Sequence, residues 1–201
     1  MKRVLIVLIA IISPYILFAG DNKKKKPAAA AAKTVEDKEI HWMNWDELQV
    51  AMKKEPRKVW VDVYTDWCGW CKRMDATTYK NPGVVKYINT KFYAVKFNAE
   101  KEDNIMFIGK MYKIDGQTRT NQLAVELMNS QLSYPTSVFM DEHYQTRQAI
   151  PGFHPVGEMQ MILTYLGDDV YKSKKFEEYQ QSFKPTWDNG APQQPMPPMA
   201  H

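Results

Sequence analysis

The pair Cys68 and Cys71 limits what this chain can fold into more than any other feature of its sequence. They are the only cysteines among 201 residues, and they form a Cys-x-x-Cys motif. A mostly apolar run at 59–64 precedes them and predicts a short buried strand, and a helix-compatible run follows. Two thiols three positions apart at the start of a helix lie within disulfide distance, and the helix N-terminus favours a thiolate at the first. The pattern therefore predicts a redox-active pair.

Three other interpretations of the two cysteines are weaker. A structural disulfide that closes so short a loop constrains the unfolded chain very little. A zinc site usually needs about four ligands, but there is no second cysteine pair, and the histidines are scattered at His41, His143, His154 and His201. Two buried free thiols that pack as small apolar side chains are the third alternative. The flanking tryptophans and the strand-then-helix context argue against it.

The amino-terminal residues 1–19 are predicted to be a signal peptide. Lys2 and Arg3 precede an apolar stretch that ends in a Leu-Phe-Ala edge suited to cleavage. The alternative is an uncleaved anchor, but the stretch is shorter than the ~17–25 residues of a spanning helix and Pro14 interrupts it. We therefore expect an exported, periplasmic protein, which would be tethered to the membrane if this segment were retained.

Composition divides the rest of the chain into three parts. Residues 20–39 form a Lys/Ala-rich linker, residues 40–183 carry the pattern of one folded domain, and residues 184–201 form a Pro-rich tail that is expected to be disordered. The formal net charge is only +4, and four consecutive lysines lie in the linker. Nucleic-acid binding is therefore not expected.

Apolar periodicity and capping signals predict the elements of the folded part. The expected helices begin after Asn44 and Asn81, each a suitable N-cap, and others cover 121–130, 155–166 and 168–183. A second strand is expected at 92–98. Strand, helix and strand within about forty residues form a βαβ unit, whose two strands are parallel.

Further motifs accompany the cysteine pair. Asp62 stands six residues before Cys68, Lys96-Phe97-Asn98-Ala99-Glu100 ends the second strand, Tyr134-Pro135 opens a strand at 137–140, and Gly152 follows a strand at 145–150. With these motifs, residues 40–166 resemble the thioredoxin superfamily, specifically its exported thioredoxin-like branch. The resemblance implies an α/β, thioredoxin-like fold, in which a central mixed β-sheet is flanked by helices. It also implies a cis-proline at Pro135, and the amphipathic pattern over 168–183 adds an extra helix at the C-terminal end.

The expected chemistry is thiol–disulfide exchange. Cys68 is the predicted exposed nucleophile, and Cys71, more buried, is the predicted resolving thiol. Asp62 matches the family's buried carboxylate and is the predicted proton acceptor of Cys71, with a pKa raised by burial. The alternative role for Asp62 is to cap a local backbone group. The resemblance further implies that Lys96 tunes Asp62.

Four residues are predicted to contact substrate. The resemblance implies that Pro135 faces the cysteines and that the backbone of Tyr134 pairs with an extended substrate peptide. Trp67 and Trp70 flank the nucleophile, and an exposed Trp70 would offer an apolar contact. The alternative for both tryptophans is ordinary packing.

The chain departs from the family between Glu100 and Pro135. Residues 105–119 are predicted to be an inserted β-hairpin, with Asp115-Gly116 as its turn. Two roles for this hairpin stay open. It protects the sheet edge or adds packing, or it recognises a partner beside the cysteine pair.

The expected function is an exported oxidoreductase that reduces disulfides of other exported proteins and is recycled by a membrane thiol electron donor. No cofactor and no bound metal are expected. An oxidase or isomerase in the same compartment is the nearest alternative, because Gly69-Trp70 does not fix the reduction potential. About 30 mV corresponds to about 1.4 kcal/mol, which is too fine a difference to infer from sequence. A non-catalytic binding or chaperone-like module, and a metal bridged by two cysteine pairs in a dimer, are further alternatives.

Overall fold

The computed structural model describes residues 37–145 and 147–187. The predicted signal peptide, nearly all of the predicted linker and residues 188–201 of the predicted tail lie outside this part. None of the helices in the described part is both long and apolar enough to cross a bilayer.

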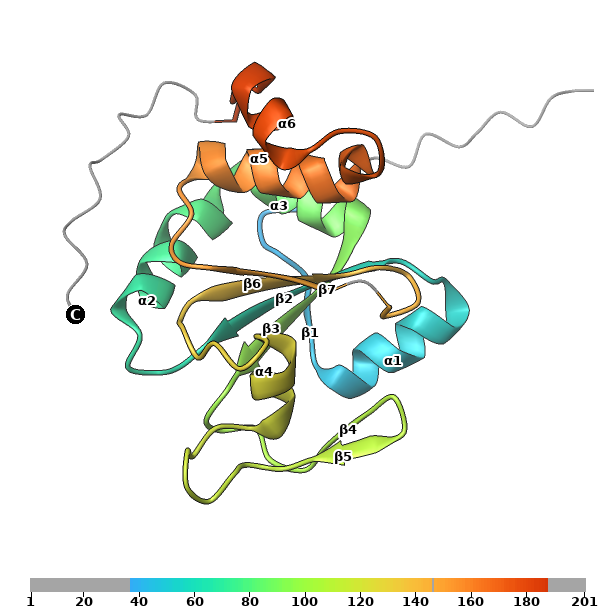
Figure 1. The fold of residues 1–201 in the computed structure, drawn as a ribbon, viewed down its shortest axis with the longest axis vertical. Helices are drawn as coiled ribbons and strands as arrows, with labels where there is room; N and C mark the ends of the chain where they lie inside the picture. Colours follow the sequence, from blue (N-terminus) through green and yellow to red (C-terminus); the bar gives the residue numbers. More distant parts are fainter. Residues whose placement is uncertain (1–36, 146, 188–201) are drawn as a thin grey trace, which may run out of the picture. The chain divides into compact units, whose positions relative to one another are not determined.

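A five-stranded mixed sheet forms the centre of the described part (Figure 1). Strand β2 (Lys58–Tyr64) lies in the middle, parallel to β3 (Phe92–Asn98) and antiparallel to β6 (Thr136–Met140). The short β1 (Trp42–Met43) pairs with β3, and β7 (Arg147–Pro151) pairs with β6. The predicted parallel crossover from β2 to β3 and the mixed sheet are confirmed.

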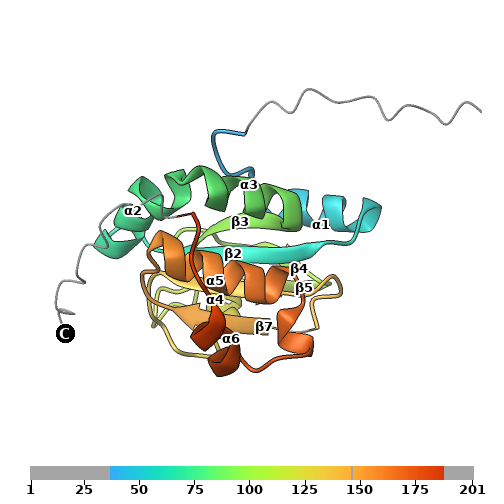
Figure 2. The ribbon, with the colours of Figure 1, turned by 90° about the horizontal axis from the view of Figure 1, so that it is seen from above.

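Helices cover both faces of the sheet (Figures 1 and 2). Over one face lie α3 and α5, and over the other lie α1, α4 and the β4–β5 hairpin. The helices and hairpin strands are α1 (Trp45–Lys54), α2 (Gly69–Ala76), η1 (Thr78–Lys80), α3 (Pro82–Lys91), β4 (Ile105–Phe107), β5 (Lys110–Tyr112), α4 (Gln122–Leu127), α5 (Val156–Gly167), η2 (Val170–Lys172) and α6 (Phe176–Ser182).

The alternation of side chains along β2 decides which of them reach the candidate site. Val59, Val61 and Val63 belong to the core cluster beneath α1 and α4. Trp60 belongs to the opposite cluster, with residues of α2, η1, α3 and α5. Because successive strand residues point to opposite faces, Asp62 shares the face of Trp60. A carboxylate therefore enters an otherwise apolar layer.

The N-caps predicted from sequence are confirmed. The Asn44 side chain accepts the N–H of Glu47 at 2.9 Å, and Glu47 returns a bond to the Asn44 N–H at 2.9 Å, which completes a capping box at α1. The Asn81 side chain accepts two backbone N–H groups at the start of α3, where proline holds the first helical position.

The hairpin exists, but its predicted turn at Asp115-Gly116 is wrong. Strands β4 and β5 are antiparallel and are joined by Ile108-Gly109, with φ of 48° and 74°. A β-branched residue rarely adopts positive φ, so this turn could not be predicted from local residue preferences. Asp115 instead organises the following loop, where its carboxylate accepts two backbone N–H groups.

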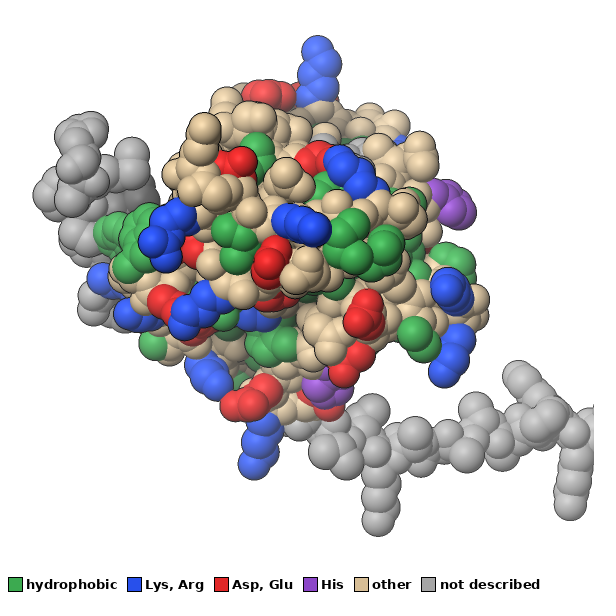
Figure 3. All heavy atoms as spheres, turned by 90° about the horizontal axis from the view of Figure 1, so that it is seen from below, with side chains coloured by type: hydrophobic (Ala, Val, Ile, Leu, Met, Phe, Trp, Pro, Cys, Tyr) green, Lys and Arg blue, Asp and Glu red, His purple; other side chains and the backbone are tan. Residues whose placement is uncertain are grey.

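The hairpin packs against the domain and also exposes apolar side chains. Phe107 is buried against Trp45, and the Gln49 side chain bonds the β4 edge at the Met106 carbonyl (2.8 Å) and the Ile108 amide (3.3 Å). Met106 and Ile108 are nevertheless exposed. Figure 3 views the molecule from this side, where apolar side chains are interleaved with charged ones. The packing role is therefore visible, while partner recognition stays a prediction.

The C-terminal part differs from the prediction in two ways. The single helix expected over 168–183 is divided into η2 and α6, and Asp169, at φ 59°, lies in the left-handed region just before η2. The chain also stays folded beyond the predicted boundary at 183. The N–H groups of Thr186 and Trp187 donate to Gln160 Oε1 at 2.7 and 3.0 Å. This docking depends on tertiary contacts that a Pro-rich composition does not indicate.

Candidate active site

Cys68 and Cys71 form a disulfide in this structure. Cys68 is the N-cap of α2, and its sulfur accepts the backbone N–H of Cys71 at 3.0 Å. The predicted placement of the pair at a helix start is therefore confirmed, and a negative charge on the Cys68 sulfur would meet a backbone donor and the positive end of the helix dipole. In this disulfide form Cys68 is only 4% exposed, so the expected exposed sulfur is not seen.

Asp62 is 1% exposed and both of its oxygens are hydrogen-bonded. Tyr79 Oη donates to Oδ1 at 3.0 Å, and Lys96 Nζ donates to Oδ2 at 2.5 Å. Lys96 is the register partner of Asp62 in the β2–β3 pair, which places both side chains on one face. Burial raises the pKa of Asp62, and the Lys96 ammonium opposes this effect only in part. Both hydrogen bonds of Asp62 thus come from side chains rather than from a local backbone group.

Lys96 occupies a site of aromatic rings and carboxylates. Its ammonium also pairs with Asp75 of α2, and it lies 5.1, 4.9 and 5.2 Å from the ring centres of Trp42, Tyr64 and Tyr79. Burial alone would lower the pKa of Lys96, but the carboxylates of Asp62 and Asp75 raise it overall. A permanent positive charge is thus held beside the buried carboxylate.

Trp67 is 66% exposed and stands beside the predicted peptide-binding proline. Its ring meets the Tyr134 ring edge-on at 5.7 Å, and its indole N–H donates to Glu100 Oε2 at 2.9 Å. The Tyr134–Pro135 peptide bond is cis, as the resemblance implied. The structure therefore brings Trp67, which directly precedes Cys68 in the chain, against the ring of Tyr134, the residue before the cis-proline.

Trp70 is half-buried rather than exposed as expected. Its ring packs on Phe153 at 5.3 Å, and the Arg73 guanidinium lies over both rings, at 5.6 and 5.7 Å. Packing with its neighbours, the alternative considered for this tryptophan, is thus observed. The ring keeps part of its surface open to solvent.

Sequence reasoning missed two residues that contact this network. Asp75 lies four positions after Cys71, which places the two on the same face of α2, so helical spacing could have found it. Tyr79 lies in η1, between two helices, where no periodic signal marks the direction of a side chain. Only the fold brings its hydroxyl to Asp62.

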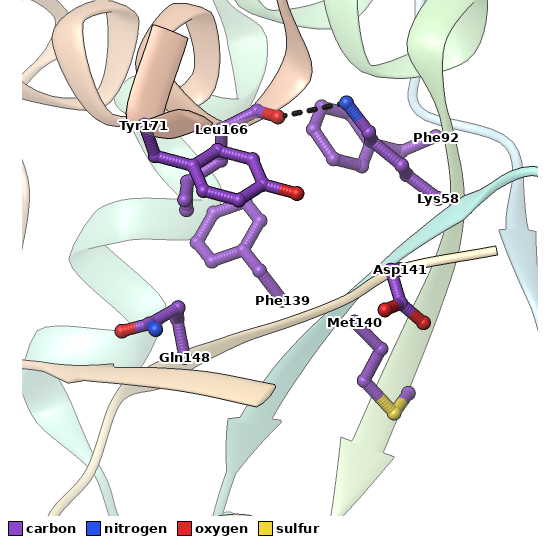
Figure 4. A pocket seen from close by; sticks show the side chains of 8 residues that line it. All are labelled: Lys58, Phe92, Phe139, Met140, Asp141, Gln148, Leu166 and Tyr171. Carbon is purple, nitrogen blue, oxygen red and sulfur yellow. Dashed lines mark hydrogen bonds between the residues drawn. The ribbon is translucent and has the colours of Figure 1, made fainter. Parts of the chain in front are cut away.

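A small cavity of about 20 Å³ lies apart from the cysteines, at the end of α5 (Figure 4). One of its polar lining residues is the buried Lys58, whose ammonium donates to the carbonyls of Leu166 and Gly167 at 3.0 and 3.1 Å and to Asp169 at 2.7 Å. All three hydrogens of the ammonium are paired, and it caps carbonyls at a helix C-terminus. The cavity is of the size of a single water molecule, so Lys58 has a structural role.

Within residues 37–145 and 147–187, no group of three or more histidine, cysteine, aspartate or glutamate side chains is arranged to hold a metal ion.

A family model described as a thioredoxin-like domain matches residues 45–167, which is more than half of the chain. The chain therefore belongs to the thioredoxin-like domain family. The disulfide-bonded Cys-x-x-Cys pair lies within the matched domain, which makes the chain a member of the thioredoxin superfamily.

Individual relatives match less of the chain. The protein disulfide-isomerase C17H9.14c of Schizosaccharomyces pombe is 36% identical over 76 residues, which is 38% of this chain and 19% of that protein. The chain thus spans about a fifth of the length of this relative.

Similar solved structures have low identity and modest overlap. A DsbH oxidoreductase is 14% identical with a TM-score of 0.47, covering 78% of this chain and 96% of that one. A thioredoxin-fold protein from Helicobacter pylori is 19% identical with a TM-score of 0.47, covering 63% and 79%. A thioredoxin from Thermus thermophilus is 16% identical with a TM-score of 0.46, covering 66% and 93%.

Proposed function

We propose that this protein is exported and reduces disulfides in other exported proteins. The observation that carries the proposal is the Cys68–Cys71 disulfide at the N-terminus of α2 in a thioredoxin-like domain. Export is supported by the signal-like segment 1–19, with its basic start and short apolar stretch. A membrane thiol donor would return the disulfide to the dithiol.

The reaction begins with attack by the Cys68 thiolate on a substrate disulfide. One substrate sulfur leaves as a thiolate, and the other becomes bonded to Cys68 as a mixed disulfide. The Cys71 thiolate then attacks the Cys68 sulfur and releases the second substrate thiolate. Two electrons pass to the substrate, and the enzyme is left with the Cys68–Cys71 disulfide.

Asp62 would accept the proton that Cys71 loses before its attack. Its burial raises the pKa of the carboxyl, so that this group can take up and release a proton closer to neutral pH than an ordinary aspartate. Trp67 and the cis-peptide at Tyr134–Pro135 would contact the substrate peptide. Trp70 would offer its remaining solvent-facing surface.

Mixed-disulfide trapping tests the exchange reaction. A Cys71→Ser variant should accumulate substrates bound covalently through Cys68, because the resolving thiol is gone. The matched Cys68→Ser variant should trap nothing. Partners retained without any covalent adduct in either variant would replace the oxidoreductase proposal with a binding module.

Equilibration with glutathione buffers tests the direction. A reductase should have a potential near that of thioredoxin, about −270 mV. A value near about −120 mV, that of a strong oxidant, would instead make the protein an oxidase.

A further inference from the structure

The hydroxyl of Tyr79 has three polar neighbours in the buried layer, Asp62, Met74 and Ser137. Its oxygen is 3.0 Å from Asp62 Oδ1 and 3.6 Å from the sulfur of Met74. The ring is 4% exposed and meets the rings of Trp60 and Trp42 edge-on, at 5.2 and 5.8 Å. The ring is therefore fixed, and the hydroxyl hydrogen can choose between its acceptors only by rotation about the C–O bond.

The two oxygens of Asp62 have different partners. Oδ2 faces the Lys96 ammonium, which can donate but has no lone pair to accept. Oδ1 faces Tyr79, whose hydroxyl can both donate and accept. A proton that arrives on Asp62 can therefore be accommodated on Oδ1, where the neighbour can reverse its role, and not on Oδ2.

Few other groups bear on this carboxyl. Lys96 reaches it from β3, Asp75 lies nearby on α2 and pairs with the same ammonium, and Tyr79 comes from η1. From β6, the residue in register is Ser137, whose hydroxyl does not titrate but interacts with Tyr79 and opposes in part the rise in the Tyr79 pKa. Cys71, on the same helix as Asp75, becomes titratable once the disulfide is reduced.

We infer that Tyr79 is a positioning residue that makes Oδ1 the oxygen on which Asp62 receives the Cys71 proton. The inference rests on the proposed role of Asp62 as proton acceptor. In the charged state Tyr79 donates to Oδ1. When the S–H bond of Cys71 breaks, the proton moves to Oδ1, and the electron pair stays on the Cys71 sulfur for its attack on Cys68. The new carboxylic acid donates to Tyr79 Oη, and the Tyr79 hydrogen turns to the Met74 sulfur.

The direction in which each partner shifts the pKa of Asp62 depends on whether it stabilises the charged or the protonated carboxyl. A donor to the carboxylate favours its charged form, and Tyr79 accordingly lowers the pKa of Asp62 against the larger effect of burial. Burial and the neighbouring Asp62 charge raise the pKa of Tyr79 itself well above its usual value, so the hydroxyl keeps its hydrogen. The Met74 sulfur, in contrast, assists only the protonated state of Asp62.

The test follows the carboxyl carbon of Asp62 by ¹³C NMR across pH in the disulfide form. In Tyr79→Phe the titration midpoint should rise by about one pH unit, a tenfold gain in proton affinity. The control Tyr112→Phe removes a hydroxyl that donates to Glu126 at 2.9 Å in the hairpin, and it should leave the midpoint unchanged. An unchanged or lower midpoint in Tyr79→Phe would overturn the inference.

A second variant tests the alternation of partners. Met74→Leu conserves volume in a fully buried site but removes the sulfur. It should lower the Asp62 midpoint, opposite to Tyr79→Phe, because the protonated state loses an acceptor. A midpoint that does not fall would refute the turn toward Met74.

The rate of substrate release from a mixed disulfide, measured in a single turnover with Cys71 intact, separates this inference from the proposed function. In Tyr79→Phe the rising limb of the plot of release rate against pH should shift to higher pH, by the same amount as the NMR midpoint. Asp62→Asn should abolish that limb if Asp62 accepts the proton. An unchanged limb in Asp62→Asn would overturn the proposed role of Asp62, whereas an unshifted carbon midpoint in Tyr79→Phe overturns only the role of Tyr79.

Discussion

The Asp62 carboxyl should make the protein less stable as pH rises. Burial raises the pKa of Asp62 above its ordinary 3.8, and Lys96 offsets this only partly. A carboxyl that binds its proton more tightly in the native state contributes stability below its unfolded pKa, and this contribution is lost as pH rises through the native pKa. While the native state holds one proton more than the unfolded chain, the free energy of unfolding falls by about 1.4 kcal/mol per pH unit.

Asp62→Asn removes this titration while conserving size, and Lys96 keeps Asp75 as its partner. Urea unfolding of both proteins in the disulfide form, in which the cysteines do not titrate, gives the difference in free energy of unfolding at each pH. The free energy of unfolding of the variant, relative to that of the wild type, should increase as pH rises above 3.8. The slope should approach about 1.4 kcal/mol per unit and then level off once Asp62 is ionised in both states.

The control is Asp115→Asn, because backbone N–H donors from Thr118 and its neighbour lower the pKa of Asp115. For that variant the difference should run in the opposite direction, with the wild type gaining as pH rises. If the Asp62→Asn difference were flat with pH, or favoured the wild type more at high pH, the reasoning from burial would be refuted.

Three further substitutions test the packing. Gly83→Ala places a Cβ 2.6 Å from a ring carbon of Trp187, so it should lower the free energy of unfolding in urea by about 1–3 kcal/mol. When it is combined with Trp187→Ala, which removes the ring, the same substitution should instead stabilise α3 by up to about 1 kcal/mol. Phe107→Ala should cost about 3–5 kcal/mol in the same assay, and a loss under about 1 kcal/mol would contradict a packing role for the hairpin. Gln49→Ala should speed hydrogen exchange at the Ile108 amide while β3 amides stay protected; equal rates would contradict the edge contact.

Elements with local signals could be predicted from the sequence. The caps at Asn44 and Asn81 depend on backbone groups two or three residues away, so the sequence nearby specifies them completely. Strand β2 is buried along almost its whole length, as its near-continuous apolar run predicts for a strand at the centre of a sheet. The position of the cysteines at a helix start was also predictable, because the buried strand ends at Tyr64 and the helix-compatible run begins at Gly69.

Features that depend on distant contacts were not predictable. The turn at Ile108-Gly109 places a β-branched residue at positive φ, which local backbone preference disfavours. In this turn the Ile108 N–H donates to the Gln49 side chain, a contact that comes from α1. The docking of 186–187 depends on Gln160, a polar residue of α5 that composition could not link to a Pro-rich segment. In both cases a side chain from another element satisfies backbone donors.

The candidate site combines both kinds of feature. Asp62 and Lys96 are fixed by sheet register, and a slip of one residue in the β2–β3 pair would send one of the two charges to the opposite face. Register is strongly specified here because both faces of β2 are buried, so this pair follows from the strand patterns. Tyr79 depends instead on the connection between α2 and α3. The ion pair is therefore set by the sheet common to the fold, while the hydroxyl that meets Oδ1 is set by a segment that can vary without disturbing the sheet. Differences in proton handling between proteins of this fold can thus arise in η1 with the cysteines and the Asp–Lys pair unchanged.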